Sequence, residues 1–222
     1  MKKFALIVAG GSGNRMKSEV PKQFLDLLGR PVLMHTMEIF YRYDPEIIFI
    51  LVLPEIWMAL WNELCKKHNF SLKHQLVRGG DVRFRSVQNG LQQISDEGIV
   101  FIHDGVRPLA STQTIHNCYE MAVKKGNSLP VVPVSESVRE VNAHHSKTVD
   151  RSKYFLVQTP QTFQVSLIQK AYSQSVFEDH TDDASVLEGT GATIHLTEGN
   201  RENIKITYPE DLLFAEAILS HQ

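Results

Sequence analysis

The chain has 222 residues, of which 42% are hydrophobic, and this is enough apolar material for one sizeable core. Lys and Arg number 23 against 25 Asp and Glu, so the charge is nearly balanced. A balanced charge argues against nucleic-acid binding driven by bulk positive charge, and any anion site must therefore be local. We predict a single domain over residues 1–222, with residues 135–158 as an excursion from it.

Two features of the sequence favour a location inside the cell. The two cysteines, Cys65 and Cys118, fall in segments with helical spacing and form no Cys-x-x-Cys pair, so we expect buried free thiols in a reducing compartment. The apolar run after the N-terminus has only about six residues, which is too short for a signal peptide. No apolar run reaches the ~18 residues of a membrane span. We therefore expect a soluble, cytoplasmic protein with no membrane partner.

The first element is an apolar and partly β-branched run at residues 4–8, which predicts a buried strand. The stretch that follows it, Ala9-Gly10-Gly11-Ser12-Gly13, has almost no side-chain bulk, and Arg15 and Lys22 come shortly after. Such a loop brings backbone N–H groups close to a ligand, and nearby cations neutralise phosphate charge. We therefore predict that this loop binds a polyphosphate and that the two cations stabilise charge that grows during bond breaking.

Two familiar glycine-loop motifs do not fit this stretch. A Walker loop needs four residues between Gly and Gly-Lys, whereas here Gly10 is followed five positions on by Arg15. A dinucleotide fingerprint needs a third glycine three positions after Gly13, where the chain has Met16. A plain strand-to-helix turn remains the alternative to a polyphosphate site at this point.

Strands and helices alternate through the next part of the chain. Continuous apolar runs predict buried strands, and helical spacing of apolar residues predicts the helices between them. The expected elements are helices at 31–43, from 54 through 65, at 83–94 and from about 111 to 125, and strands at 47–53, 74–78, 99–103 and 128–134. This repeat predicts an α/β fold with a Rossmann-like, mostly parallel sheet and helices on both faces.

Three turns follow strands of this predicted sheet, at residues 9–13, 79–81 and 104–108. In open sheets of this kind, ligands bind beyond the carboxyl ends of the strands, so we expect the three turns to form one site. Asp104 in the third turn suits Mg²⁺ at a phosphate site, although it could also cap its own turn. His103, just before it, is expected to be a buried histidine with satisfied hydrogen bonds rather than a ligand.

The alternation breaks between residues 135 and 158. Val138, Val141 and Val149 alternate with polar residues around a polar turn, which predicts a β-hairpin with little core of its own. A lone hairpin is marginally stable in water. We therefore predict a protruding arm that pairs with a second copy of the chain in a homodimer, with a hairpin folded back on its own domain as the alternative.

The last part of the chain returns to helices with two short strand-like segments. Helices are expected at 165–175 and 182–188 and from Pro209 onward, and strands at 193–198 and 203–207. Thr181 is the expected cap of the second of these helices. Within the last strand-like segment, Lys205 points away from its two isoleucine neighbours, so it either enters a polar cleft or faces solvent.

Six motifs in order resemble the 2-C-methyl-D-erythritol 4-phosphate cytidylyltransferase family, a branch of the sugar- and polyol-phosphate nucleotidyltransferases. They span nearly the whole chain. They are Ala9–Met16 with Pro21-Lys22-Gln23, Gly79-Gly80 with Arg83 and Ser86-Val87, His103–Pro108, Gln158–Gln161, Thr181–Ala184, and Asn203–Thr207.

The resemblance implies an enzyme that transfers CMP from CTP to 2-C-methyl-D-erythritol 4-phosphate in isoprenoid precursor synthesis. It also implies dependence on Mg²⁺ and a homodimer whose arms cross into the neighbouring site. The residues it implies for the nucleotide are Ala9, Gly10, Gly11, Gly13, Gly80, Asp81, Arg83 and Ser86. Those implied for catalysis are Arg15, Lys22, Arg151 and Lys205. Those implied for the polyol phosphate are Asp104, Arg107, Ser137, Arg151, Thr159, Thr181 and Lys205, with Asp104 also on the metal and Arg151 and Thr159 reaching over from the other subunit's arm.

One departure from the family's pattern leaves the substrate open. The arm usually begins with Asp-Thr and a following Lys, and here it reads Glu136-Ser137-Val138-Arg139. A ribitol-5-phosphate cytidylyltransferase therefore remains an alternative. A nucleotide-binding module without catalysis and an NAD-dependent enzyme are the alternatives from other classes. The sequence also leaves open which of Arg83 and Arg85 faces the ligand.

Overall fold

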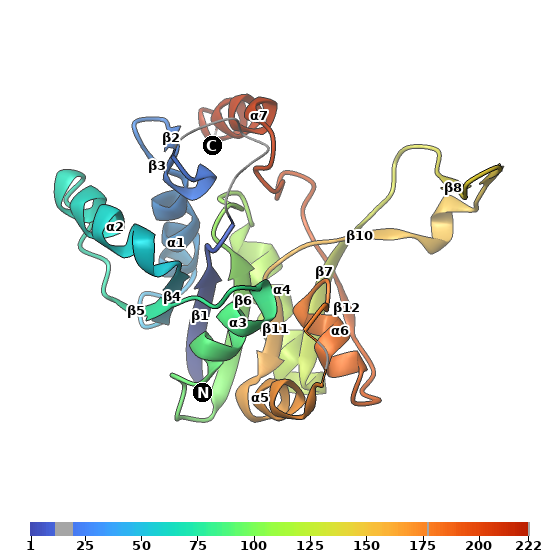
Figure 1. The fold of residues 1–222 in the computed structure, drawn as a ribbon, viewed down its shortest axis with the longest axis horizontal. Coiled ribbons are helices and arrows are strands. Elements are labelled where there is room, and N and C mark those ends of the chain that lie inside the picture. The colour runs from blue at the N-terminus through green and yellow to red at the C-terminus, as the bar shows by residue number, and fades with distance from the viewer. Residues whose placement is uncertain (12–19, 177, 222) are drawn as a thin grey trace.

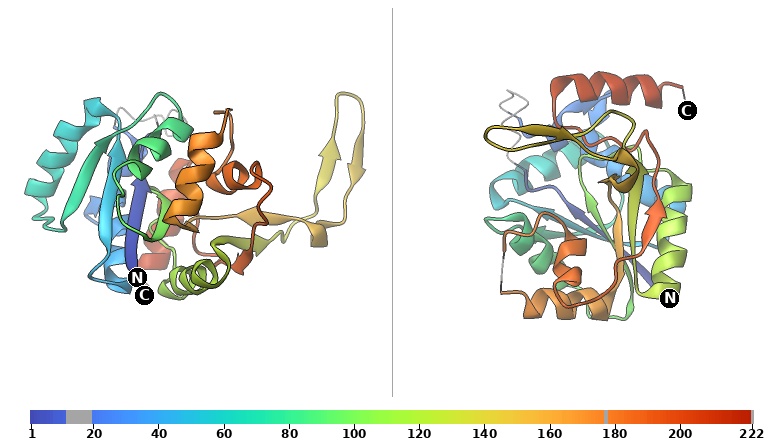
Figure 2. Two further views of the ribbon diagram at one scale, coloured as in Figure 1. Left: turned by 90° about the horizontal axis from the view of Figure 1, so that it is seen from below. Right: turned by 90° about the vertical axis from the view of Figure 1, so that its right-hand side faces the viewer.

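The computed structural model describes residues 1–11, 20–176 and 178–221. A central sheet carries helices on both of its faces, and a long hairpin stands away from this body (Figures 1 and 2). The predicted α/β class is confirmed. Gly13 and Arg15, which the sequence assigns to the phosphate loop, lie outside the described residues.

The parallel half of the sheet is built from four strands that the sequence predicts. These are β1 (Lys2–Val8), β4 (Ile48–Leu53), β5 (His74–Arg78) and β6 (Gly98–Asp104). The strand β1 lies between β4 and β6, and its last residue, Val8, pairs with Val52 on one side and with Asp104 on the other. The loop after β1 and the turn after β6 therefore leave the sheet at the same level.

The other half of the sheet mixes parallel and antiparallel pairs. Its members are β7 (Asn127–Pro133), β10 (Phe155–Val157), β11 (Gln161–Gln164) and β12 (Leu196–Glu198), and the overall order is β10-β7-β11-β6-β1-β4-β5 with β12 paired to β7. The strand β11, which the sequence analysis does not predict, runs antiparallel to β6 and pairs Gln161 with Ile102. This pairing brings Thr159 next to the end of β6.

Alternate residues of β1 divide the core between the two faces of the sheet. Phe4 and Leu6 join the cluster formed with α3 (Arg83–Leu91), α5 (Val165–Gln174) and α6 (Asp183–Glu188). Ala5 and Ile7 join the cluster on the opposite face, formed with α1 (Val32–Tyr43), α2 (Glu55–Lys67) and α4 (Thr112–Lys125). Trp61 of α2 is fully buried, as expected for a core tryptophan.

A smaller apolar cluster closes the end of the molecule near the site. It joins β2 (Asp26–Leu27), which follows η2 (Lys22–Phe24) and pairs with β3 (Arg30–Pro31), to α7 (Pro209–Leu219). The expected strand at 203–207 is wrong, because this segment is irregular and Ile206 bonds through its N–H to the carbonyl of Val106 without entering a ladder. The expected cap of α6 is also wrong, because Asp182 rather than Thr181 accepts the N–H of Ser185.

The predicted hairpin is confirmed as a protruding arm with β8 (Arg139–Val141) and β9 (Ser146–Thr148), followed by η3 (Arg151–Lys153). The residues of both strands are exposed, and the arm points away from its own domain rather than folding back on it (Figure 2). Its return leg becomes β10, which pairs antiparallel with β7, so the base of the arm is part of the main sheet. None of the helices in the described chain combines the length and apolar character that a membrane crossing requires.

Candidate active site

The three turns singled out in the sequence meet around one cavity of about 270 Å³ at the carboxyl ends of β1, β5 and β6. The prediction that they share one edge of the sheet is confirmed. The residues lining the cavity that the sequence assigns to function are Ala9, Gly10, Gly11, Lys22, Gly80, Asp81, Arg83, Ser86, Asp104 and Lys205.

The loop after β1 is tied to the sheet and to the short helix that follows it. The N–H of Ala9 donates to the carbonyl of Val52, and the carbonyl of Ala9 accepts from the side-chain amide of the buried Gln23. Lys22, the neighbour of Gln23, is 8% exposed and donates through Nζ to the carbonyl of Ile206 at 2.9 Å. The ammonium therefore lies in the cavity wall, next to the segment that carries Lys205.

The second turn is held closed by Ser86. Its Oγ accepts from the N–H of Gly80 at 3.1 Å and donates to the carbonyl of Val82 at 3.2 Å. A Cβ on Gly80 would lie 2.3 Å from the Cβ of Arg85, so this position requires glycine. The turn predicted to read the base and ribose is therefore shaped by the protein itself.

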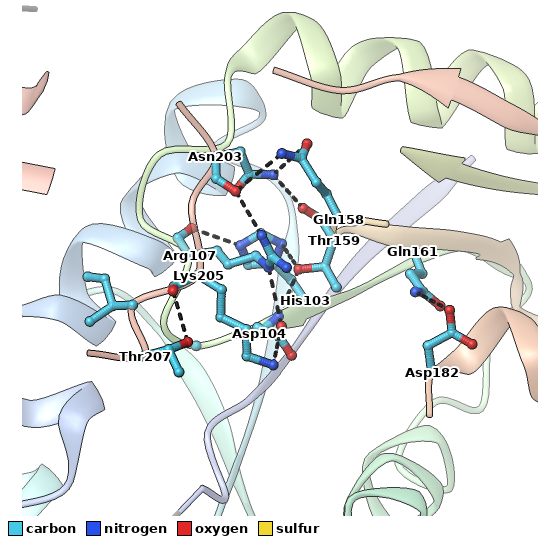
Figure 3. A network of polar contacts seen from close by, with 12 residues as sticks. His103, Asp104, Arg107, Gln158, Thr159, Gln161, Asp182, Asn203, Lys205 and Thr207 are labelled. Atoms are coloured by element: carbon cyan, nitrogen blue, oxygen red, sulfur yellow. Dashed lines mark hydrogen bonds and ion pairs between the residues drawn. The ribbon is translucent and has the colours of Figure 1, made fainter. Parts of the chain in front are cut away.

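Asp104 lies in the middle of the site, where Arg107 and Lys205 meet its carboxylate (Figure 3) and Arg83 approaches it as a third cation. Its oxygens are 3.1 Å from Lys205 Nζ, 3.3 Å from Arg107 Nε and 4.0 Å from Arg83 Nε. Burial alone would raise the pKa of Asp104, but Lys205 and the two arginines hold that pKa well below its usual range. The carboxylate is therefore ionised at any working pH. Lys205 combines the two expected placements, because its side chain is 43% exposed while its ammonium reaches the Asp104 carboxylate in this cleft.

The described residues do not fit a Mg²⁺ ion held by Asp104. The carboxylate is already engaged by the three cations, and the described part of the chain holds no group of three or more His, Cys, Asp or Glu side chains suited to a metal. Mg²⁺ takes one or two carboxylates together with substrate phosphates and water, so a single carboxylate shared with three cations does not hold the ion without phosphate ligands.

His103 braces the turn that carries Asp104. Thr159 Oγ1 accepts from the N–H of Asp104 at 3.1 Å and lies 3.0 Å from His103 Nδ1, while His103 Nε2 lies 3.0 Å from the carbonyl of Arg107. The Thr159 hydroxyl accepts from a backbone N–H and keeps its own proton to donate, so we assign this hydroxyl as the donor to His103 Nδ1. The imidazole ring then carries its proton on Nε2, which donates to the carbonyl of Arg107. Burial lowers the pKa of His103 to about 4, so the ring is neutral. His103 is a buried, satisfied histidine, as predicted.

This brace also corrects the expected position of Thr159. The side chain is 5% exposed and bonds to Asp104 and His103 of its own chain, so it does not reach a neighbour's site from the arm. The reason is the antiparallel strand β11, which starts just after it and runs beside β6.

Asn203, whose role the sequence did not indicate, joins the segment of Lys205 to the Asp104 turn. Its carbonyl accepts from Arg107 Nη1 at 2.7 Å, and its side-chain Nδ2 donates to the carbonyl of Thr159 at 2.8 Å (Figure 3). Asn203 is fully buried. It therefore fixes the irregular segment at the distance from which Lys205 meets Asp104.

A second cavity of about 300 Å³ adjoins the first and shares Arg83, Asp104 and Lys205 with it. The predicted residues Arg107, Thr159 and Thr181 also line it. Gln161 and Asp182, which the sequence analysis did not assign to the site, complete this wall and bond to each other at 3.1 Å. The two cavities therefore meet at the Asp104 carboxylate and the cations around it.

The structure shows which of Arg83 and Arg85 faces the cavities. Arg83 lines both cavities, whereas Arg85 is exposed and forms an ion pair with Glu178. Ser137 and Arg151 are exposed on the arm and are not brought into the site of their own chain. Arg151 bonds there to the carbonyl of Ser135.

The family model described as 2-C-methyl-D-erythritol 4-phosphate cytidylyltransferase matches residues 4–221. The chain belongs to this family. A protein of that name from Bacteroides thetaiotaomicron is 50% identical over 219 residues, which cover 99% of this chain and all of that one. One from Bacteroides fragilis is 51% identical over 215 residues, covering 97% of this chain and 98% of that one.

Solved structures agree with the sequence relatives. The crystal structure of 2-C-methyl-D-erythritol 4-phosphate cytidylyltransferase from Thermus thermophilus superposes with a TM-score of 0.83 at 28% identity, covering 99% of this chain and 100% of that one. The 4-diphosphocytidyl-2C-methyl-D-erythritol synthase from Anaerococcus prevotii gives a TM-score of 0.83 at 29% identity, covering 99% and 96%. Family membership makes this chain a cytidylyltransferase, and neither a binding module nor an NAD-dependent enzyme describes it.

Proposed function

We propose that the first cavity binds CTP, that the second binds 2-C-methyl-D-erythritol 4-phosphate, and that the chain joins them into 4-diphosphocytidyl-2-C-methyl-D-erythritol with release of pyrophosphate. The observation that carries this proposal is the shared wall of the two cavities. Lys205 and Arg83 line both, so one group of cations faces both phosphate substrates. The names of the close relatives support the same substrates.

The chemistry needs no general base. The second pKa of a phosphate monoester is about 6, so the polyol phosphate is mostly a dianion at neutral pH. One of its oxygens attacks the α-phosphorus of CTP, the bond from that phosphorus to the bridging oxygen breaks, and pyrophosphate leaves with the electron pair. The difficulty is to hold two anions in contact, and fixed cations solve it by positioning and by neutralising charge.

The roles of the side chains follow from their places. Lys22, in the wall of the first cavity, neutralises the triphosphate, and Arg15 has the same role by family resemblance. Lys205 and Arg107 hold the phosphate of the polyol, assisted by Thr181. Asp104 attracts both cations and holds them oriented until the substrate phosphate arrives.

Dependence on Mg²⁺ remains part of the proposal. Because the described residues do not fit an ion held by Asp104, we expect Mg²⁺ to bind together with CTP, on phosphate oxygens and water. Titration of the protein with CTP, with and without Mg²⁺, tests this. Titration with Mg²⁺ alone should give no heat, and tight binding of the ion alone would contradict the expectation.

We also propose a homodimer formed through the arm. The arm's base exposes apolar side chains on both faces of β10, Phe155 and Val157 (46% and 42% exposed) on one and Leu156 (56%) on the other, and such exposed apolar surface favours a protein partner. In a dimer, Ser137 and Arg151 would approach the partner's polyol. Replacing residues 137–149 with a short Gly-Ser linker removes the projecting part of the arm but keeps residues 155–157, so it should weaken the dimer in sedimentation velocity. A variant that dimerises as tightly as the wild type would refute a role for the projecting part. A cytoplasmic location is proposed from the free thiols Cys65 and Cys118.

One assay tests the proposed reaction against its nearest alternative. Pyrophosphate release is measured with CTP, Mg²⁺ and either 2-C-methyl-D-erythritol 4-phosphate or ribitol 5-phosphate. We expect release with the first acceptor. Release with ribitol phosphate alone would establish the other cytidylyltransferase, and no release with either would contradict the proposal.

A further inference from the structure

A fully buried carboxylate, Asp183, lies behind the site and is used by none of the roles above. It is the first residue of α6 and is 0% exposed. It accepts from Arg83 Nη1 at 2.8 Å, from Arg83 Nη2 at 2.7 Å and from the hydroxyl of Tyr172 at 2.7 Å. A charge this deeply buried is stable only when it is paired and hydrogen-bonded, and these contacts meet that condition.

The pair fixes the plane of the Arg83 guanidinium. A bidentate contact between guanidinium and carboxylate defines both distance and orientation, which a single contact cannot do. With both terminal nitrogens engaged by Asp183, the remaining edge of Arg83 is directed so that Nε lies 4.0 Å from Asp104. What Arg83 presents to the two cavities is therefore decided by a residue that lines neither of them.

The pair also connects the two halves of the site. Arg83 opens α3, just after the turn of Gly80 and Asp81 that lines the first cavity. Asp183 follows Thr181 and Asp182, which line the second cavity. The two residues are 100 positions apart in the chain. Their contact holds the nucleotide turn and the acceptor loop at a fixed separation.

Tyr172 of α5 holds the carboxylate from a third side. Its ring is 2% exposed and stacks on Phe84 with the centroids 4.7 Å apart. Burial and the neighbouring Asp183 raise the pKa of Tyr172 well above its ordinary value, so its hydroxyl stays a proton donor. Tyr172 and Arg83 thus donate to Asp183 from two different helices.

We infer that Asp183 and Tyr172 are positioning residues that fix Arg83 between the two halves of the site, so that loosening this contact weakens the use of both substrates together. The inference rests on the proposed function, because it assumes that the two cavities receive the two substrates.

The mildest test is Tyr172→Phe, which keeps the stacked ring and removes one hydrogen bond to Asp183. We expect kcat/KM to fall roughly fivefold or more for both CTP and the polyol phosphate, which is within the range of interaction energies between contacting residues. The matched control is Arg85→Gln. It removes the exposed ion pair with Glu178, which links α3 to the segment before α6 outside the cavities, and should leave both values within about twofold.

A second pair of variants separates positioning from folding. Asp183→Asn should lower both kcat/KM values more than Tyr172→Phe does, and Asp183→Glu, which restores the carboxylate, should recover part of the loss. All variants are assayed well below their melting temperatures. A Tyr172→Phe protein with a lower melting temperature but unchanged kinetics would show a purely structural role and overturn the inference. A loss confined to one substrate would overturn it as well.

Failure of the proposed function would be recognised separately. If the wild-type chain released no pyrophosphate with either acceptor, calorimetric titration with CTP would still compare the wild type with Tyr172→Phe. Weaker CTP binding in the variant would support the positioning of Arg83, and equal binding would overturn it.

Discussion

His103 should make the stability of this protein depend on pH in a window set by its burial. The ring is fully buried and packs against Phe40, and both of its nitrogens are bonded, to Thr159 and to the carbonyl of Arg107. Burial holds its pKa at about 4, against 6.5 for an exposed histidine. A proton added to Nδ1 would be buried and would meet the hydroxyl that now donates to it.

The sign and size of the effect follow from linkage. At pH values above 6.5 both folded and unfolded chains carry a neutral His103, and the ring contributes no dependence on pH. Between pH 6.5 and about 4 the unfolded chain binds a proton that the folded chain does not, so stability falls as the pH falls. The slope is about 1.4 kcal/mol per pH unit, and the loss between about pH 7.5 and about pH 5 is roughly 2 kcal/mol. Asp104 adds nothing in this window, because the ordinary pKa of an aspartate, about 3.9, already lies below it and the surrounding cations lower the pKa of Asp104 further.

Urea unfolding of the wild type at these two pH values measures the difference directly. His103→Gln should be less stable at the higher pH and should lose most of the dependence, keeping a smaller share from His35, whose pKa burial also lowers. A wild type whose unfolding free energy is the same at both pH values would refute the reasoning. A His103→Gln protein that keeps the full slope would assign the dependence to other groups.

Three further changes test the site. Lys22→Ala should lower turnover roughly 10²–10³-fold, while its circular dichroism spectrum should match that of the wild type because the fold is kept. Near-normal turnover would argue against the role of Lys22. Gly105→Ala would place a Cβ 2.7 Å from the Cβ of Ala9, so the phosphate loop must shift; we expect weaker CTP binding by calorimetry, and unchanged affinity would contradict this. Asp104→Asn leaves the surrounding cations unbalanced and should lower the melting temperature, with inorganic phosphate restoring more stability than it adds to the wild type. Equal phosphate effects on both proteins would count against the charge argument.

The sequence alone predicts the parallel half of this fold well, for reasons that are local. A continuous apolar run predicts a buried strand such as residues 48–53, and Gly80 predicts a tight turn. The rule that parallel strands end at one edge then places three separate turns in one site without any further information.

The contacts that complete the site join residues far apart in the chain, and no pattern within a short stretch of the sequence predicts them. The pairing of β11 with β6 cannot be derived from the short segment Gln161–Gln164, so nothing in the sequence opposes the implication of the family resemblance that Thr159 reaches the other subunit's site. Asp183 lies in a motif that the sequence shows, but its partner Arg83 is 100 positions away. A helix face can be predicted from spacing, whereas an ion pair between distant segments depends on the tertiary fold.

The two walls that meet at Asp104 differ in how they are built. The strand β6 is buried at every residue and hydrogen-bonded on both sides, by β1 and β11. The segment of Lys205 has no ladder of its own, and its Ile206 amide bonds to one carbonyl of the Asp104 turn. Amide hydrogens of β6 should therefore exchange only through global unfolding, while those of 203–207 exchange through smaller local openings. A ligand that bridges both walls would slow exchange in the second segment first, and part of its binding energy would be used to order that wall.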